Sequence, residues 1–372
     1  MTAPRHPDAR GYEVEDTPRS TERTYLPYLD VTRILAVLAV VGIHVVGGGV
    51  SSGEVGVAVV ALDMALVAAV PVFFMMAGAL ALDPRAHRGG PAEFLRRRAM
   101  RIVPAMVVWS AFYIVVIRGL VSGLEVSTDI VLAMVVTGQT YTHLYFLFAI
   151  AGLYLLTPLI HPFLAQAEGR RAWTLGFVAS AWTLLVMGIG QAAKAGTGPQ
   201  IPLQLGTFTF FLAYLGYFVL GRAMLVRPVP RTVAVVALLA VPGLIALTTW
   251  LYVVSAADAV DGEPSAWSAV LAPSYVSPTV MVYSIVLMSA VSSLFRSCRV
   301  PEGTAAVLRT LGNATFGVFL VHFAVLVVLR AAVPALDTYQ TLPMLITWTV
   351  TVLVSGAVAL LGHRVPGLRL IL

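Results

Sequence analysis

The stretch YLDVTRILAVLAVVGIHVVGG (Tyr28–Gly48) decides the class of fold, because it is an apolar segment long enough to cross a lipid bilayer as one helix. Asp30 and Arg33 stand at its entrance, and His44 lies deep inside it. Charged and ionisable side chains are costly to place within a membrane, and they are rare there. Those that do occur in such a segment are therefore candidates for function.

The composition of the whole chain excludes an ordinary soluble domain. Of its 372 residues, 59% are hydrophobic and 11% are charged, and the mean hydropathy is +0.88. Apolar runs of about 20 residues predict an all-α polytopic membrane protein with about ten transmembrane helices. These runs cover residues 31–50, 56–82, 103–121, 143–165, 173–190, 207–226, 231–254, 274–296, 313–333 and 342–362. Cys298 is the only cysteine, which excludes disulfides and cysteine-based metal sites.

The basic residues predict the orientation of these helices. With this set of spans both termini lie on one side of the membrane, and 21 of the 24 Lys and Arg residues fall on that side. The positive-inside rule makes this the cytoplasmic side. We therefore expect a multi-pass protein of the plasma membrane with both termini in the cytoplasm. The pI near 9.6 follows from this topology, and no nucleic-acid partner is expected.

The chain is predicted to consist of a tail and one membrane domain. Residues 1–27 are polar, mixed in charge and without the apolar core of a signal peptide, so they predict a disordered cytoplasmic tail before a transmembrane domain at 28–372. Residues 83–104 predict a cytoplasmic interfacial helix, and residues 123–141 a re-entrant or surface piece on the outer face. No internal repeat is visible, so the inverted halves of many transporters are not supported.

Polar side chains of the first span share one helix face. Arg33 and His44 are 11 residues apart, which returns a helix to within roughly 20° of its starting face after a rise of about 16 Å. Asp30, three residues before Arg33, can pair with it. Asp63 enters the second span from the opposite side to a similar depth, so adjacent antiparallel helices are expected to bring it to His44. A carboxylate on one ring nitrogen would fix the tautomer and make the other nitrogen more basic, as a general base requires.

A second deep histidine, His322, lies in LGNATFGVFLVHFAV, with Asn313 and Thr315 at the start of that span. Each of these polar residues also has a purely structural interpretation. Buried histidines and Asp63 can form hydrogen bonds between packed helices. Arginines near the ends of spans can serve only as positive-inside anchors.

The motifs of this chain resemble those of the acyltransferase-3 family of integral membrane acyltransferases. The resemblance rests on five segments in the family's order: LDVTRILAVLAVVGIH (29–44), VPVFFMMAGALAL (70–82), RRRAMRIVP (96–104), HLYFLFAIAGLYLLTPLI (143–160) and LGNATFGVFLVH (311–322). The third segment contains the family's Arg-x-x-Arg as Arg98 and Arg101. Two positions depart from the pattern, because Ala77 replaces a usual Ser and Tyr145 a frequent Trp. No appended hydrolase-like domain is expected, so transfer would be completed within the bundle.

The resemblance implies an enzyme, a membrane O-acyltransferase. It would pass an acyl group, with acetyl the first expectation, from cytoplasmic acyl-CoA to a hydroxyl group on an acceptor reached from the outer side. The implied acceptors are a cell-surface polysaccharide or lipid-linked carbohydrate, or a secreted glycosylated metabolite, in a bacterial membrane. No permanently bound cofactor and no metal are expected, and homo-oligomerisation is left open.

The resemblance and the residue chemistry together assign roles. Arg33, Arg98 and Arg101 suit the phosphates of CoA, because a guanidinium fork pairs bidentately with phosphate oxygens. His44, with Asp63, is the expected general base for the acceptor hydroxyl. Direct transfer is preferred because no Ser or Cys lies in a nucleophile arrangement beside His44, and an acyl-histidine intermediate stays open. Supporting roles are expected for Asp30, His143, Tyr145, Asn313 and His322.

Two other classes of protein remain as alternatives. A proton-coupled transporter or exporter would use Asp63, His44 and His322 to carry protons, and it would be expected to show repeat symmetry. A sensor with a degenerate site is the other alternative. The intact arginines and His44 count against it.

Overall fold

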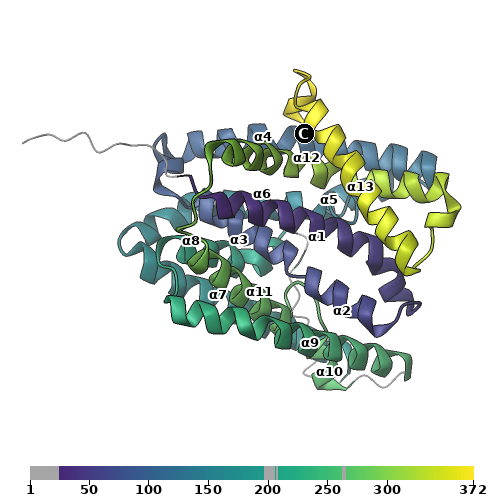
Figure 1. Ribbon diagram of the computed structural model, residues 1–372, viewed down its shortest axis with the longest axis horizontal. Helices are drawn as coiled ribbons and strands as arrows, with labels where there is room; N and C mark the ends of the chain where they lie inside the picture. The colour runs from purple at the N-terminus through teal and green to yellow at the C-terminus, as the bar shows by residue number, and fades with distance from the viewer. Residues whose placement is uncertain (1–24, 197–205, 207, 262–264) are drawn as a thin grey trace, which may run out of the picture.

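We describe the protein from a computed structural model that covers residues 25–196, 206, 208–261 and 265–372 (Figure 1). The predicted disordered tail, apart from its last three residues, lies outside this range. Within the range all regular elements are helical. The α-helices are α1 Pro27–Ser52, α2 Val57–Leu66, α3 Ala69–Ala81, α4 Gly90–Phe112, α5 Thr128–Thr137, α6 Tyr145–Ala165, α7 Glu168–Lys194, α8 Leu215–Val226, α9 Arg231–Asp261, α10 Ala266–Leu271, α11 Pro278–Leu294, α12 Glu302–Ala332 and α13 Thr341–Gly362. Shorter helical turns are η1 Pro84–His87, the π-helix η2 Tyr113–Val121, η3 Phe210–Tyr214, η4 Pro334–Leu336 and η5 Leu368–Leu370.

Apolar helices of membrane-spanning length confirm the predicted all-α polytopic class. Eight helical stretches of the described residues are long and apolar enough to cross a bilayer: Pro27–Ser52, Val57–Ala81, Gly90–Val121, Tyr145–Ala165, Glu168–Lys194, Arg231–Val260, Glu302–Ala332 and Thr341–Gly362. Two further predicted spans, 207–226 and 274–296, correspond to the shorter apolar helices Phe210–Val226 and Pro278–Leu294. The chain is therefore a multi-pass membrane protein.

The second predicted span, 56–82, is broken in two. α2 ends at Leu66 and α3 begins at Ala69. Pro71 explains the break, because a proline ring clashes with the carbonyl group four residues earlier, here that of Val67, and offers that carbonyl no N–H. α2 packs against α1 and α9, whereas α3 packs mainly against α8 and α1.

The third predicted span and the predicted interfacial helix are one element. A continuous helical stretch runs over Gly90–Val121, with Pro104 inside it and a π-helical last part. At 32 residues it is about 48 Å long, well beyond the ~30 Å hydrocarbon core, so its first turns extend out of the membrane. The expectation of a separate interfacial helix was therefore wrong. α5 within the segment 123–141 has no buried residue, as a surface piece requires.

The helix α1 runs through the middle of the bundle, between α12 and α11 in the view of Figure 1. It packs against α2, α3, α12 and α13. On one side of this centre, α3 and α8 approach so closely that a Cβ atom at Gly78 or Gly221 would overlap the backbone of the opposite helix. These two glycines let the helices pack backbone to backbone, as small residues do in membrane proteins.

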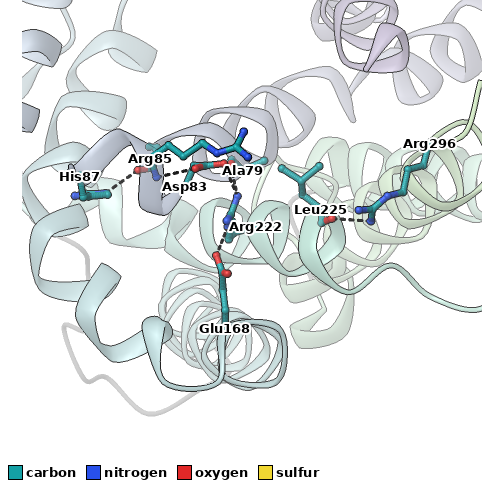
Figure 2. Close-up of polar contacts among 9 residues, drawn as sticks. Ala79, Asp83, Arg85, His87, Glu168, Arg222, Leu225 and Arg296 are labelled. Atoms are coloured by element: carbon teal, nitrogen blue, oxygen red, sulfur yellow. Dashed lines mark hydrogen bonds and ion pairs between the residues drawn. The ribbon is translucent and has the colours of Figure 1, made fainter. Parts of the chain in front are cut away.

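A buried arginine ties three helical segments together at the end of the bundle where α1 begins. Figure 2 shows Arg222 of α8 between two carboxylates from other segments. Its Nη1 lies 3.1 Å from Asp83 Oδ2, and its Nε lies 2.5 Å from Glu168 Oε1. Nη1 also donates to the carbonyl oxygen of Ala79 at 3.3 Å. The side chain of Arg222 is only 7% exposed, so this network is a structural element of the fold.

Candidate active site

A funnel of arginines opens at the end of the bundle where α1 begins. We call the outer part the vestibule, a cavity of about 660 Å³ whose basic lining residues are Arg33, Arg85, Arg88, Arg97, Arg98 and Arg101. A narrower inner cavity of about 220 Å³ continues from it and shares Arg33, Arg98 and Arg101. Arg98 and Arg101 are three residues apart on α4, which places both guanidinium groups on one helix face. The structure therefore brings the three arginines of the sequence prediction together.

Arg98 and Arg101, two of the four arginines of α4, are free to bind an anion. The Arg98 guanidinium lies 4.9 Å from the ring centre of Tyr154, and that of Arg101 lies 6.0 Å from the ring centre of Phe316. Among the described residues, no carboxylate lies within ion-pair distance of either guanidinium. Aromatic faces attract these cations without using their N–H donors, so the donors remain available to a ligand.

Arg33 is positioned by a small buried network, and its predicted pairing with Asp30 is confirmed. Arg33 Nη1 donates to Asp30 Oδ1 at 3.4 Å, while Tyr25 donates its hydroxyl to Asp30 Oδ2 at 2.8 Å. Burial and the hydrogen bond to Asp30 raise the pKa of Tyr25 to about 12, so the phenol stays a donor. Gly312 of α12 leaves room for this carboxylate, since a Cβ there would lie 2.7 Å from Asp30 Oδ1. Asp30 thus orients Arg33 toward the vestibule.

Three histidines from three segments meet in the interior. The ring centres of His44 and His322 are 5.3 Å apart, those of His143 and His322 are 4.9 Å apart, and those of His44 and His143 are 6.2 Å apart. His44 comes from α1, His322 from α12, and His143 from the turn before α6. His143 and His322 are buried, whereas His44 keeps part of its surface exposed. We call these three side chains the histidine cluster.

The tautomer of His322 follows from its backbone contacts. Its Nδ1 lies 2.7 Å from the carbonyl oxygen of Phe319 and 3.2 Å from that of Val318. Carbonyl oxygens only accept hydrogen bonds, so Nδ1 carries the proton and Nε2 is left with a free lone pair. The buried Nε2 has no hydrogen-bond partner. The backbone of α12 therefore fixes the tautomer of His322, whereas the sequence analysis expected a carboxylate to fix that of His44.

The structure does not bring Asp63 to His44, so that predicted pairing is wrong. No hydrogen bond or ion pair joins the two side chains, and the buried Oδ1 of Asp63 has no hydrogen-bond partner. Asp63 instead interacts electrostatically with Tyr252 of α9 and with Tyr275. The packing of α2 on α9 is the physical reason, because it places Asp63 near Tyr252.

An aromatic wall separates the inner cavity from the histidine cluster. Phe146 and Phe319 line the cavity, and their ring centres are 5.4 Å apart. On its other side the ring of Phe319 lies 5.3 Å from that of His143. None of the three histidines lines the inner cavity. Arg33 and His44 were expected on one face of the first span, but the cavity that Arg33 lines ends at Phe319, and this ring lies between the cavity and the histidine cluster.

The remaining predicted residues divide into two groups. Asn313 and Thr315 line the inner cavity, and so does Ala77, the residue that replaces a family serine. Tyr145 lines neither the vestibule nor the inner cavity, and its ring faces that of Tyr214 at 6.4 Å. Tyr145 is therefore not part of the cavity wall.

Sequence reasoning missed half of the vestibule arginines. Arg85, Arg88 and Arg97 had been counted only as positive-inside anchors. The signal was present, because Arg97 and Arg101 are one helical turn apart and share a face. The sequence contains no comparable signal for the aromatic wall, because Phe146 and Phe319 come from different helices and meet only when α6 and α12 pack together.

His87 holds η1 at the rim of the vestibule. Its ring stacks on His161 at 4.0 Å and on Phe94 at 4.4 Å between centres, and Nε2 lies 2.9 Å from the carbonyl oxygen of Ala81. Partial burial lowers the pKa of His87, and the hydrogen bond to Ala81 only partly opposes this shift. Packing of the η1 segment against His161 and Phe94 therefore favours the neutral form of the His87 ring.

We expect the η1 segment to loosen in acid. With a lowered pKa in the docked state, docking is fully stabilised above the ordinary histidine pKa of about 6.5 and weakens as the pH falls below it. Hydrogen exchange of residues 83–89, corrected for the intrinsic rate, should rise between about pH 7.5 and about pH 5. His87→Phe keeps the stacking without a titratable proton, so a pH response that persists in this variant would contradict the assignment.

Comparison with known protein families places this geometry in context. The sequence profile of the acyltransferase-3 family, described as an acyltransferase domain, matches residues 26–363. The chain belongs to the acyltransferase-3 family, and it is a membrane acyltransferase. No curated protein and no solved structure matches the chain. The matched range includes every helix that contributes to the vestibule, the inner cavity and the histidine cluster.

Proposed function

We propose that the protein transfers an acyl group, in the simplest case acetyl, from cytoplasmic acyl-CoA to a hydroxyl group of an acceptor that arrives from the opposite side of the membrane. The proposed acceptor is a cell-surface or lipid-linked carbohydrate, or a secreted glycosylated metabolite. One observation supports this most strongly. The arginine vestibule leads into an inner cavity that ends one phenylalanine ring away from a cluster of three histidines.

The vestibule suits the head group of CoA. Among the described residues the guanidinium groups of Arg98 and Arg101 form no ion pair. Charge-assisted bonds to phosphate oxygens are among the strongest hydrogen bonds that a protein forms. Arg33, held by Asp30, adds a third donor at the boundary of the two cavities. The narrow inner cavity would receive the pantetheine arm and direct the thioester toward Phe319.

The acyl transfer would take place where the inner cavity meets the histidine cluster. His44 would accept the proton of the acceptor hydroxyl, whose oxygen then attacks the thioester carbonyl carbon. The C–S bond breaks, and the CoA thiolate takes the proton back from the imidazolium. His44 is the partly exposed member of the cluster, so an acceptor can reach it. A rotation of the Phe319 side chain would open the aromatic wall and let the thioester reach His44. While the wall is closed, it would keep water away from the thioester.

The geometry favours an enzyme over a proton-coupled transporter. A proton path in this chain would need Asp63 to exchange protons with the histidine cluster. Asp63 faces α9 instead, and it makes no contact with His44 that would carry a proton. The carboxylate expected to serve a transporter is thus separated from the histidines.

Arg98→Gln and Arg101→Gln should each weaken the binding of CoA by about 10- to 100-fold, because a hydrogen bond to a charged group contributes about 1.5–3 kcal/mol. The KM for acetyl-CoA should rise by the same factor, while kcat changes little, since both side chains lie far from the thioester. Isothermal titration with CoA and steady-state kinetics would measure the two effects.

Arg96→Gln is the matched control for these variants. Arg96 lies on the same helix, pairs with Glu93 at 2.8 Å and lines neither cavity. It should bind CoA as the unchanged protein does. An equal loss of affinity in all three variants would mean that the general positive charge of the surface, and not the vestibule, attracts CoA.

Labelled acetyl-CoA tests the function itself. Purified protein in liposomes should release labelled acetate slowly in water, and it should label glycans or secreted metabolites when these are supplied from matched cells lacking the gene. Failure to cleave the thioester of acetyl-CoA and of longer acyl-CoA donors, in protein that binds CoA, would overturn the proposal.

A further inference from the structure

A second cavity, unrelated to the arginine funnel, lies on another face of α1. It measures about 410 Å³ and shares no lining residue with the vestibule or the inner cavity. It is bordered by α1, by the segment around the α2–α3 break, and by the end of α11. Leu35 in its wall is 60% exposed, so the cavity opens toward the outside of the bundle, where lipid would be.

The walls of this cavity are largely apolar and combine large side chains with several alanines. Five alanines contribute to them: Ala36, Ala39, Ala65, Ala68 and Ala69. Along α1 the lining extends from Pro27 to Ala39, a distance of about 18 Å, which is close to half of the ~30 Å hydrocarbon core. The cavity therefore has the length of the acyl chain of one membrane leaflet, and a volume in the usual ligand range of about 300–1,000 Å³.

Two arginines lie at the end of the cavity that the α11–α12 connection forms. Phe295, Cys298 and Val300 of the α11–α12 connection line the cavity at this end. Arg296 and Arg299 lie between them in sequence and are exposed. Among the described residues their guanidinium donors meet only carbonyl oxygens.

Arg296 lies beside the cavity entrance. Its Nη1 donates to Leu225 O at 2.8 Å, as Figure 2 shows, and its charge acts on Tyr28, which lines the cavity. Arg299 Nη1 donates to Cys298 O at 3.4 Å. Each guanidinium thus uses one donor within the protein and keeps the others for a ligand.

We propose that this cavity binds one acyl chain of an anionic phospholipid, whose phosphate pairs with Arg296 and Arg299. An apolar groove that faces hydrocarbon is filled by lipid chains, and the two arginines at its head add charge complementarity that a zwitterionic lipid satisfies less well. Basic pockets between transmembrane helices recognise anionic head groups in this way. The site is independent of the acyl-transfer reaction, because α1 separates the two cavities.

Native mass spectrometry of the full chain in detergent tests this proposal. Phosphatidylglycerol and phosphatidylcholine with identical acyl chains would be titrated in parallel, and we expect one phosphatidylglycerol to bind more tightly than phosphatidylcholine. Arg296→Gln and Arg299→Gln should each reduce this preference about fivefold. Ala39→Phe, which fills the cavity, should abolish the bound lipid of either kind.

Matched variants keep the test decisive. Arg309→Gln removes a partly exposed arginine that pairs with Glu302 and does not line this cavity, and Ala240→Phe adds a ring to an exposed alanine of α9. Both controls should retain the lipid and its head-group preference. Equal binding of the two lipids by the unchanged protein would overturn the proposal, as would retention of the lipid in Ala39→Phe. A dimer that Ala39→Phe dissociates would show instead that a second copy covers the groove.

Discussion

His44→Ala should lower kcat for acyl transfer by a factor of about 10²–10⁴ and leave CoA binding unchanged, because a positioned general base contributes a factor of this size. His44 is the most exposed member of the histidine cluster, since His143 and His322 are 3% and 0% exposed, so it is the ring that a hydroxyl acceptor can reach. Steady-state kinetics with acetyl-CoA and titration with CoA would separate the two quantities.

Two further variants make this prediction specific. His44→Gln retains a polar side chain without a base in this pH range, so it should lose as much activity as His44→Ala. His363 lies after α13 and outside the cluster, and His363→Ala should keep normal activity. Transfer that survives in His44→Ala and His44→Gln but is lost in His322→Gln would move the base to the free Nε2 of His322 and would refute the assignment of His44.

The first helix could be predicted in detail from its sequence. The spacing of Asp30, Arg33 and His44 fixes their common face by helix geometry alone, and the structure keeps the Asp30–Arg33 pair. His322 could be identified in the same way, as an ionisable group deep in an apolar run. The Asp30–Arg33 pair could be predicted because both residues belong to one helix.

Predictions that joined two helices were weaker. The pairing of Asp63 with His44 assumed a straight second span, and Pro71 breaks that span four residues after Val67. Pro71 is visible in the sequence as a helix-breaking residue. Which neighbour Asp63 contacts once the helix is broken cannot be read from the sequence. The aromatic wall of Phe146 and Phe319 depends on side-chain packing between α6 and α12, which the period of each helix alone does not specify.

The buried network of Arg222 was also beyond sequence reasoning. Its partners come from the segment after α3 and from the first residue of α7, so their sequence separations are 139 and 54 residues. In the sequence Arg222 is one more basic residue at the end of a span. Only the packing of α8 against α3 and α7 makes it a shared cation for Asp83 and Glu168.

Arg222→Met should reduce the free energy of unfolding by about 3 kcal/mol, because it leaves two carboxylates without their cation in a buried site. We take the lower end of the range of about 3–5 kcal/mol since Asp83 and Glu168 are 21% and 25% exposed and water can partly solvate them. Denaturant titration of the purified protein in mixed micelles, followed by circular dichroism, would measure the change.

Removing the whole network tests whether the unpaired carboxylates cause this loss of stability. Asp83→Asn and Glu168→Gln added to Arg222→Met eliminate the unpaired charges, so the triple variant should recover most of the lost stability, as replaced buried ion pairs often do. Asn at position 83 also keeps the oxygen that accepts from the backbone N–H of Arg85 at 2.8 Å. Arg227→Met, five residues further on and exposed, should change little. If the triple variant were less stable than Arg222→Met, the loss would come from missing packing around the arginine side chain, and the carboxylates would not be its cause.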